Sequence, residues 1–365
     1  MEKISASVKR NDYNYQIYLG SGILNDAAKH IQKNHPDKKL VIITDDSVGK
    51  ICGNKIKDSF SELEPYVISL PAGEKTKSRE TKNKVEDILL GKNYGRDTLI
   101  VAIGGGVIGD LSGYIASTYN RGIPIIHIPT TLLAMVDSSI GGKTGVNTRH
   151  GKNIIGSIWQ PDAVFADMDF LKTLPKEEFL NGMAEIIKMS IILDKGLFSY
   201  IGDNVDKILD KNKDELQHII SRSIELKKDV IEKDEAEAGL RQKLNFGHTV
   251  GHALENHYDY KKKHGLCVSL GMAAESKISV LSGLLQEEEQ SRIISLLEAF
   301  GLPTKIENKV ENSKIVSLMK IDKKSRVQKP HFVMINGIGQ VKSENGKYSF
   351  EVSEEIIINS IEKSK

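Results

Sequence analysis

The strongest constraint on the fold is a regular alternation in the first half of the chain. Short, β-branched runs bounded by turn residues lie at 39–44, 66–70, 98–104 and 124–129. Stretches with apolar residues at helical spacing lie between them, at 23–33, 78–90 and 107–119. Because parallel strands are joined by crossover helices, this alternation predicts a buried parallel sheet with helices on both faces.

The pattern changes after residue 170 to longer helical segments. The predicted helices are 177–192, 213–231, 241–258, 268–281 and 287–300, and a weak strand signal returns only at 331–335. We therefore expect an α/β fold with two domains. An N-terminal Rossmann-like, parallel-sheet domain would span 1–172, and a mainly α-helical domain would span 173–365.

Composition narrows the class of partner and the compartment. The 51 basic and 49 acidic side chains nearly cancel, which argues against nucleic acid or a membrane surface as the main partner. Cys52 and Cys267 cannot form a disulfide framework, and Cys267 is expected to be a buried small hydrophobe. Because the chain has no signal-peptide pattern and no apolar run of the ~20 residues that span a bilayer, we expect a cytoplasmic protein.

A glycine-rich loop follows the strand at 98–104. Gly104, Gly106 and Gly109 satisfy GxGxxG where a helix begins, so the backbone could approach a pyrophosphate. The acidic residue that usually ends the next strand is missing, because that strand ends in Pro129–Thr131. Asp45 ends an earlier strand and is the candidate for binding the ribose. A tight turn that packs a helix on a sheet explains the same glycines equally well.

The helical half contains three histidines that could supply two metal ligands and one group that binds phosphate or handles a proton. His248 and His252 are four residues apart, so on a helix they face one side, and His264 follows in HGLCVSLGM. The metalloprotease motif HExxH is excluded, because threonine follows the first histidine. Glu185, on an apolar helix three residues before Lys188, is the candidate carboxylate ligand. A surface histidine pair and an ordinary Glu–Lys ion pair are the alternative.

Basic and amide side chains lie in glycine-rich loops of the first half. They are Arg121, Lys143 in GGKTG, and Lys152 and Asn153 in GKN. Glycines around a lysine suit an anion that is held by backbone N–H groups and an ammonium. Because the chain has 51 basic residues, a solvated loop position is the alternative for each of them.

Taken together, these segments resemble the 3-dehydroquinate synthase family of the sugar phosphate cyclase superfamily. The resemblance runs from the Asp45 strand to at least Lys324. It rests on GEKTKS, GGGVIGDLSG, IPTTLLAMVDSSIGGKTGVN, GKN, the 183–188 segment, LNFGHTVGHALE and HGLCVSLGM. So many motifs in one order are highly specific.

The resemblance implies an NAD-binding first domain, a metal-binding second domain and a homodimer. The implied ligands of zinc, or of cobalt in its place, are Glu185, His248 and His264. The residues that match cofactor positions are Asp45, Glu74, Lys77, Gly105, Gly106, Asp110, Thr130, Thr131, Lys143, Lys152, Thr173 and Glu178.

The resemblance also implies the groups around the substrate. Those at the phosphate are Lys143, Asn153, His252, Arg121 from the other subunit, and one of Lys323 and Lys324. Those at the substrate carboxylate or in contact with the rest of the substrate are Lys227, Arg241, Asn245, Asp137, Lys188 and Glu237. The first two would hold the carboxylate, and the last three would lie near the ring hydroxyls.

The implied reaction converts 3-deoxy-D-arabino-heptulosonate 7-phosphate, a phosphorylated sugar acid, to 3-dehydroquinate and phosphate in the shikimate pathway to chorismate and the aromatic amino acids. The enzyme would be a carbon–oxygen lyase that uses and regenerates its NAD. Three alternatives remain. A sister cyclase would take sedoheptulose 7-phosphate, a metal-dependent polyol dehydrogenase would lack the basic loops, and a nucleotide-binding scaffold would not need a set of metal ligands.

Overall fold

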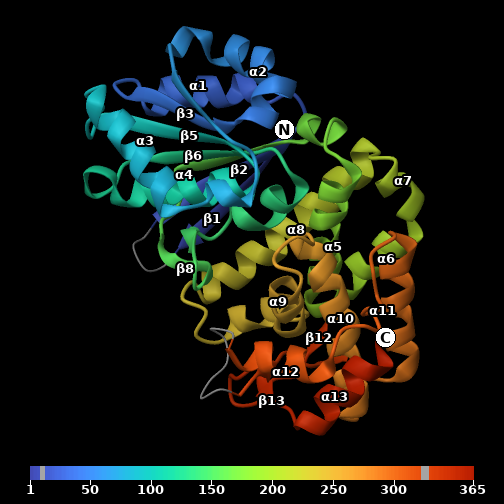
Figure 1. The fold of residues 1–365 in the computed structure, drawn as a ribbon. Helices are drawn as coiled ribbons and strands as arrows, with labels where there is room; N and C mark the ends of the chain where they lie inside the picture. The colour runs from blue at the N-terminus through green and yellow to red at the C-terminus, as the bar shows by residue number, and fades with distance from the viewer. Residues whose placement is uncertain (9–12, 322–328) are drawn as a thin grey trace. The chain divides into compact units, whose positions relative to one another are not determined.

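The structure, a computed structural model, describes residues 1–8, 13–321 and 329–365 (Figure 1). Lys323 and Lys324, of which one was expected at the phosphate, lie outside the described residues. The chain forms two compact units, Met1–Leu174 and Pro175–Lys365, whereas the expected boundary fell between 172 and 173. None of the helices in the described ranges has the length and apolarity of a membrane-spanning segment.

The first unit is an α/β unit built on a seven-stranded sheet. Its strands, in chain order, are β1 (Glu2–Val8), β2 (Tyr13–Gly20), β3 (Lys39–Asp45), β4 (Tyr66–Leu70), β5 (Thr98–Gly104), β6 (Ile125–Pro129) and β9 (Ala163–Asp167). They lie in the order β1-β2-β9-β6-β5-β3-β4, and every pair is parallel except β1 with β2. The predicted parallel α/β fold is confirmed.

Helices and one hairpin complete this unit. The helices are α1 (Leu24–Asn34), α2 (Asp46–Phe60), α3 (Arg79–Gly91) and α4 (Gly106–Thr118). The separate antiparallel hairpin consists of β7 (Lys143–Thr148) and β8 (Gly151–Ile158). Neither α2 nor the hairpin was predicted from the sequence.

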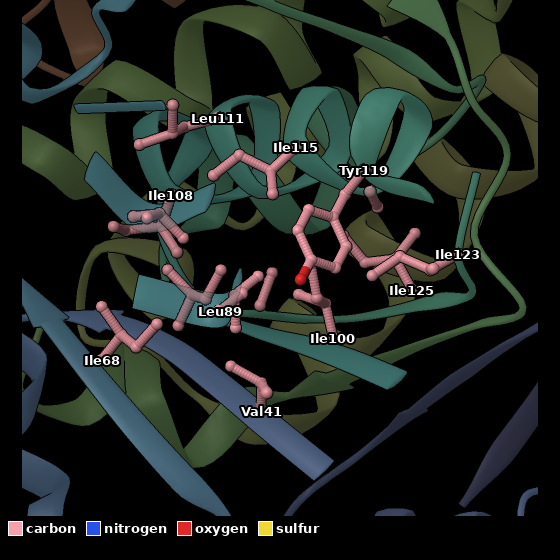
Figure 2. Packing of buried hydrophobic residues seen from close by; sticks show 14 of the residues in the cluster. Val41, Ile68, Leu89, Ile100, Ile108, Leu111, Ile115, Tyr119, Ile123 and Ile125 are labelled. Carbon is pink, nitrogen blue, oxygen red and sulfur yellow. The ribbon is translucent and has the colours of Figure 1, made fainter. Parts of the chain in front are cut away.

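An apolar cluster between the sheet and α3 and α4 fixes the strand ends that carry the loops. Ile100 of β5 shares this cluster with Leu89 of α3 and Ile115 of α4 (Figure 2). Burial of one such side chain contributes roughly 1.5–3 kcal/mol. Tyr119 lies in the same cluster, and its hydroxyl donates a hydrogen bond of 2.6 Å to the carbonyl oxygen of Tyr94. The one polar atom of this ring is therefore satisfied.

The second unit is mainly helical, as predicted. Its helices are α5 (Lys176–Leu193), α6 (Lys195–Asp203), α7 (Val205–Leu209), α8 (Lys213–Lys233), α9 (His248–His257), α10 (His264–Leu281), α11 (Glu287–Ala299), α12 (Asn312–Ile321) and α13 (Glu354–Lys363). Short strands β10 (His331–Phe332) and β13 (Phe350–Glu351) pair with each other, as do β11 (Ile335–Gly337) and β12 (Gln340–Val341).

The helix predicted over 241–258 is wrong, because two elements occupy this range. A 3-10 helix, Leu240–Asn245, is separated from α9 by two residues. Gly247 there has φ +76°, a left-handed conformation that glycine adopts without a steric penalty. The apolar spacing runs on through this break, so periodicity alone could not reveal it. Arg241 is therefore not on the same helix as His248.

Helices α5, α9 and α10 approach one another at glycines. A Cβ atom added at Gly271 of α10 would lie 1.9 Å from the carbonyl oxygen of Gly247. One added at Gly265, also in α10, would lie 2.2 Å from the carbonyl oxygen of Asn181 in α5. Since the obstructing atoms are backbone atoms, no side chain fits at either position, and the spacing of the three helices is fixed.

We predict that Gly271→Ala lowers the free energy of unfolding by at least about 1–3 kcal/mol, because the methyl group has nowhere to move. The matched control is Gly202→Ala in α6, where the nearest atom to the new Cβ would be Leu296 Cδ1 at 3.9 Å. This control should be neutral or stabilising by up to ~1 kcal/mol, through helix propensity. Urea unfolding of both variants is the measurement, and equal stability of the two would contradict the packing argument.

Candidate active site

Three helices bring together the three residues expected to bind metal. Glu185 lies in α5, His248 is the first residue of α9, and His264 is the first residue of α10. The Nε2 atoms of His248 and His264 lie 3.7 and 3.5 Å from the same oxygen, Oε1 of Glu185. A tetrahedral ion with bonds of ~2.0–2.1 Å separates its ligand atoms by roughly 3.3–3.5 Å. The donor set therefore fits a zinc-type ion with one position left for a non-protein ligand.

Each of the two histidine rings is held in orientation by a contact at Nδ1, the ring nitrogen that faces away from Glu185. His248 Nδ1 lies 3.0 Å from the carbonyl oxygen of Phe246, and His264 Nδ1 lies 3.3 Å from Oε2 of Glu255. Burial by itself would lower the pKa of His264, but the carboxylates of Glu255 and Glu185 raise this pKa to about 10. The electrostatic environment thus strongly favours a positive charge, as a metal site requires.

The second oxygen of Glu185 accepts a short hydrogen bond from Lys188. Both side chains are nearly inaccessible to solvent, with exposed fractions of 1% and 3%. The two side chains point the same way, as their spacing predicts, and they form the ion pair that was the alternative to a metal role for Glu185. Because Lys188 occupies Oε2, it leaves Oε1 directed at the histidines. His252 lies beside them, with ring centroids 5.2 Å from His248 and 6.1 Å from His264.

Each histidine helix is capped at its first turn by a side chain from a neighbouring helix. Glu275 of α10 accepts hydrogen bonds of 2.7 and 3.0 Å from the backbone N–H groups of Gly247 and Val250, at the start of α9. Asn181 of α5 accepts one of 2.6 Å from the N–H of Gly265, at the start of α10. These caps satisfy N–H groups that a helix cannot satisfy internally, and they fix the start of each helix and so the position of its first histidine.

A turn between α8 and the 3-10 helix is organised by Asp234. Its carboxylate accepts three hydrogen bonds of 2.7–2.9 Å from the backbone N–H groups of Ala238, Gly239 and Arg241. Burial alone would raise the pKa of Asp234, but these three donors hold the pKa below its usual range. Asp234 therefore holds the turn in the shape that carries the substrate residues expected there.

Four of the six residues expected at the substrate lie on this turn and on the two elements that it joins: Lys227, Glu237, Arg241 and Asn245. Lys227 of α8 and Arg241 of the 3-10 helix are buried, with exposed fractions of 5% and 3%, and the two elements pack together. The guanidinium of Arg241 donates a hydrogen bond of 2.7 Å to the carbonyl oxygen of Glu235. Asn245 donates one of 2.7 Å to the carboxylate of Glu237. The turn thus positions a cationic group and an amide in one short segment.

In the first unit, the glycine loop lies at the carboxyl ends of neighbouring parallel strands. A Cβ atom added at Gly105 would lie 3.0 Å from Cγ2 of Thr131, and one at Gly106 would lie 3.1 Å from Oγ of Ser138. The backbone N–H of Thr130 donates to the carbonyl oxygen of Gly104 at 3.0 Å. The segment that follows β6 therefore packs closely against the start of α4, where backbone N–H groups can bind an anion.

Asp45 lies at the carboxyl end of β3, next to the glycine loop after β5, since β3 and β5 are adjacent parallel strands. Its Oδ1 caps α2, accepting hydrogen bonds of 3.0 Å from the backbone N–H groups of Ser47 and Val48. The strand order reverses here, because β4 lies on one side of β3 and β5 on the other. Open α/β sheets bind their ligands at such a point.

Four of the expected residues in this unit form one electrostatic cluster. Lys77 makes a short ion pair with Asp110. Burial raises the pKa of Asp110, Lys77 opposes this, and the charges of Glu74 and Asp137 raise the pKa further. The carboxylate of Glu74 also accepts a hydrogen bond of 2.7 Å from Asn147 of β7, which connects the cluster to the hairpin.

The hairpin separates two residues that were expected at one phosphate. Lys143 lies opposite Ile158 at its open end, whereas Lys152 and Asn153 lie close to its turn. The backbone N–H of Asn153 donates a hydrogen bond of 3.1 Å to the side-chain oxygen of Asn147. Along the strands the separation of Lys143 and Asn153 is roughly 16 Å, at ~3.3 Å per residue. The hairpin by itself does not bring these two residues together.

Three further expected residues are Arg121 and Thr173, in the first unit, and Glu178 of α5, which lies beside Asn181. Arg121 precedes β6 and lies at the amino ends of the strands, whereas the glycine loop lies at their carboxyl ends. The φ of Arg121 is +68°. Thr173 donates a hydrogen bond of 3.4 Å to the carbonyl oxygen of Phe170. Glu178, in the first turn of α5, forms an ion pair of 2.5 Å with Lys263.

Comparison with known proteins identifies the family. Residues 67–181 match the family model for the 3-dehydroquinate synthase N-terminal domain, and residues 182–325 match that for the C-terminal domain. The chain belongs to the 3-dehydroquinate synthase family. The 3-dehydroquinate synthase of Thermodesulfovibrio yellowstonii is 40% identical over 97% of this chain and 98% of its own length. That of Thermoanaerobacter pseudethanolicus is 41% identical over 94% and 96%.

Solved structures of related cyclases have the same architecture as this member of the 3-dehydroquinate synthase family. A 2-deoxy-scyllo-inosose synthase with carbaglucose-6-phosphate, NAD+ and Co2+ is 26% identical, with a TM-score of 0.92 over 100% of both chains. A 2-epi-5-epi-valiolone synthase from Streptomyces hygroscopicus with NAD+ and Zn2+ is 25% identical, with a TM-score of 0.86 over 96% of both. A glycerol dehydrogenase from Schizosaccharomyces pombe, 17% identical with a TM-score of 0.69, shares the fold.

Four residues that support the candidate site were not predicted from the sequence. Neither the side-chain type nor the sequence spacing of these residues distinguishes them from surface residues. They are Asn181, Asp234, Glu255 and Glu275. Only Asp234 had a usable signal, since an aspartate that ends a helix a few residues before a glycine often accepts hydrogen bonds from the turn. The other three act across helix contacts, which spacing along one helix does not reveal.

Proposed function

We propose that the protein is a 3-dehydroquinate synthase, a carbon–oxygen lyase that converts 3-deoxy-D-arabino-heptulosonate 7-phosphate to 3-dehydroquinate and phosphate. The observation that carries the proposal is a Glu185–His248–His264 donor set in the same unit as two buried cations, Lys227 and Arg241. The first suits a metal that binds an alcohol, and the second suits a substrate carboxylate. Relatives about 40% identical over nearly the whole chain carry this name.

The proposed cofactors are NAD and a zinc or cobalt ion. When bound, the metal polarises a substrate alcohol and NAD takes up and later returns a hydride, so that the cofactor is not consumed. NAD would lie on the carboxyl edge of the sheet, with its pyrophosphate on the N–H groups that Gly105 and Gly106 leave accessible. The ribose hydroxyls would bind near Asp45 and the Glu74–Lys77–Asp110 cluster.

The protein's part in the chemistry is to hold anions and direct protons. Oxidation of the alcohol acidifies the neighbouring C–H, and loss of that proton expels phosphate with the electrons of the C–O bond. Lys227 and Arg241 would hold the substrate carboxylate during this elimination, and His252, in the same unit, would contact the phosphate. Ring opening and an intramolecular aldol then close the carbocycle, for which a bound geometry supplies the orientation.

We expect phosphate release to need NAD and metal but to produce no net NADH. Enzyme with substrate, NAD and zinc should release phosphate while absorbance at the reduced nicotinamide band stays flat. Removing metal with a chelator should stop release, and adding zinc or cobalt should restore it. Stoichiometric NADH without phosphate release would instead identify a polyol dehydrogenase.

Substrate selectivity tests the carboxylate assignment. We predict that the wild type prefers the heptulosonate phosphate to sedoheptulose 7-phosphate, which lacks the carboxylate. Arg241→Ala should cost about 2–5 kcal/mol in kcat/KM for the acid, the range for removing one partner of a buried charge pair. Arg222→Ala in α8, which removes a half-exposed guanidinium paired with Asp194 and Glu225, is the control and should leave turnover unchanged. Equal use of both sugars by the wild type would favour a sister cyclase.

We also propose that the active form is a homodimer in the cytoplasm and that Arg121 acts in the partner's site. The support for this is the position of Arg121 at the sheet edge opposite the glycine loop. Arg121→Ala and His264→Ala should each be inactive alone. After unfolding and refolding together in equal amounts, they should regain about a quarter of wild-type activity, because half the dimers then contain one complete site. Absence of recovery, with mixed dimers demonstrated by a tag, would place Arg121 in its own chain's site.

A further inference from the structure

The metal centre contains a second buried carboxylate besides the ligand Glu185. Glu255 of α9 has an exposed fraction of 4%. Its Oε2 lies 3.3 Å from Nδ1 of His264 and 4.0 Å from Nε2 of His252. Since Nε2 of His264 faces Glu185 at 3.5 Å, the ring of His264 lies between two carboxylates.

When a metal replaces the proton on Nε2, this arrangement selects one neutral form of the imidazole. A neutral imidazole has one protonated nitrogen and one with a lone pair, and only the latter can bind a metal. A hydrogen bond from Nδ1–H to Glu255 leaves the lone pair on Nε2, directed at the centre. A carboxylate acceptor also makes the opposite nitrogen a better donor to a metal.

The two histidine ligands differ in how this is achieved. His248 Nδ1 faces the backbone carbonyl of Phe246, which no substitution can remove. His264 depends on a side chain. Of these two acceptors, Glu255 is therefore the one that a point mutation can remove while leaving Glu185, His248 and His264 in place.

We infer that Glu255 is a positioning residue that fixes the tautomer and orientation of His264 and strengthens metal binding about 10–100-fold. The inference rests on the proposed function, because it assumes a metal on Glu185, His248 and His264. A competing arrangement exists, since His252, Glu255 and His264 could themselves act as three donors. The two arrangements exclude each other for a neutral ring, because Nδ1 cannot donate to Glu255 and bind a metal at once.

The test is the zinc affinity of the full-length protein, measured by competition with a chromogenic chelator. Glu255→Gln keeps the shape and an oxygen acceptor but removes the charge, and Glu255→Leu removes the acceptor. We expect zinc binding to weaken about tenfold in the first and towards about 100-fold in the second. The control is Glu307→Gln, because this carboxylate pairs with Lys262, close to His264, and contacts no histidine ring in the described residues. It should bind zinc like the wild type.

A second readout is the visible spectrum of the cobalt-loaded protein, whose bands should shift in the Glu255 variants and not in Glu307→Gln. If Glu255→Leu does not fold, Glu255→Gln decides the matter. Wild-type affinity and an unchanged cobalt spectrum in Glu255→Gln would overturn the inference. So would a wild type that binds two zinc ions, one of which Glu255→Gln loses. A wild type that binds no zinc would refute the metal-dependent function itself, and the inference with it.

Discussion

The close approach of α5, α9 and α10 is the constraint on which the candidate metal centre depends. Glycines at the contacts let backbone meet backbone, and Asn181 and Glu275 reach across to cap the first turns of α10 and α9. Because His248 and His264 are the first residues of those helices, the caps fix the backbone positions from which both rings extend. The candidate ligands Glu185, His248 and His264 thus lie on closely packed helices, whose geometry varies less than that of loops. This suits a site that needs placement to within ~0.5 Å.

The two units contribute different kinds of binding group. The first offers backbone N–H groups and polar side chains at the carboxyl edge of a parallel sheet, where β3, β5 and β6 end side by side. The second offers buried charges, the donor set around Glu185 and the cations Lys227 and Arg241. Burying these charges is favourable only when each has an opposite charge or hydrogen-bond partners, which explains the supporting groups Lys188, Glu255 and Asp234.

Local pattern was a good guide wherever a residue's role depends on its own element. The strands at 39–44 and 98–104 follow from continuous β-branched runs bounded by turn residues. Glu185 and Lys188 point the same way because they lie three residues apart on one helix. The helix predicted over 241–258 failed because Gly247 turns the chain without interrupting the apolar spacing. The distance between Lys143 and Asn153 also could not be predicted, because it depends on the register of β7 and β8.

The sequence by itself determined the family, the parallel α/β and helical halves, and the residue types at the site, because these are written in motif order and periodicity. The tertiary structure decided which atoms face one another. It directs Nε2 of His248 and of His264 to one oxygen of Glu185, and it places their Nδ1 atoms beside Phe246 and Glu255. It also places Arg121 at the amino ends of the strands. Such choices depend on helix spacing and strand register, which are set by contacts between residues distant in the chain.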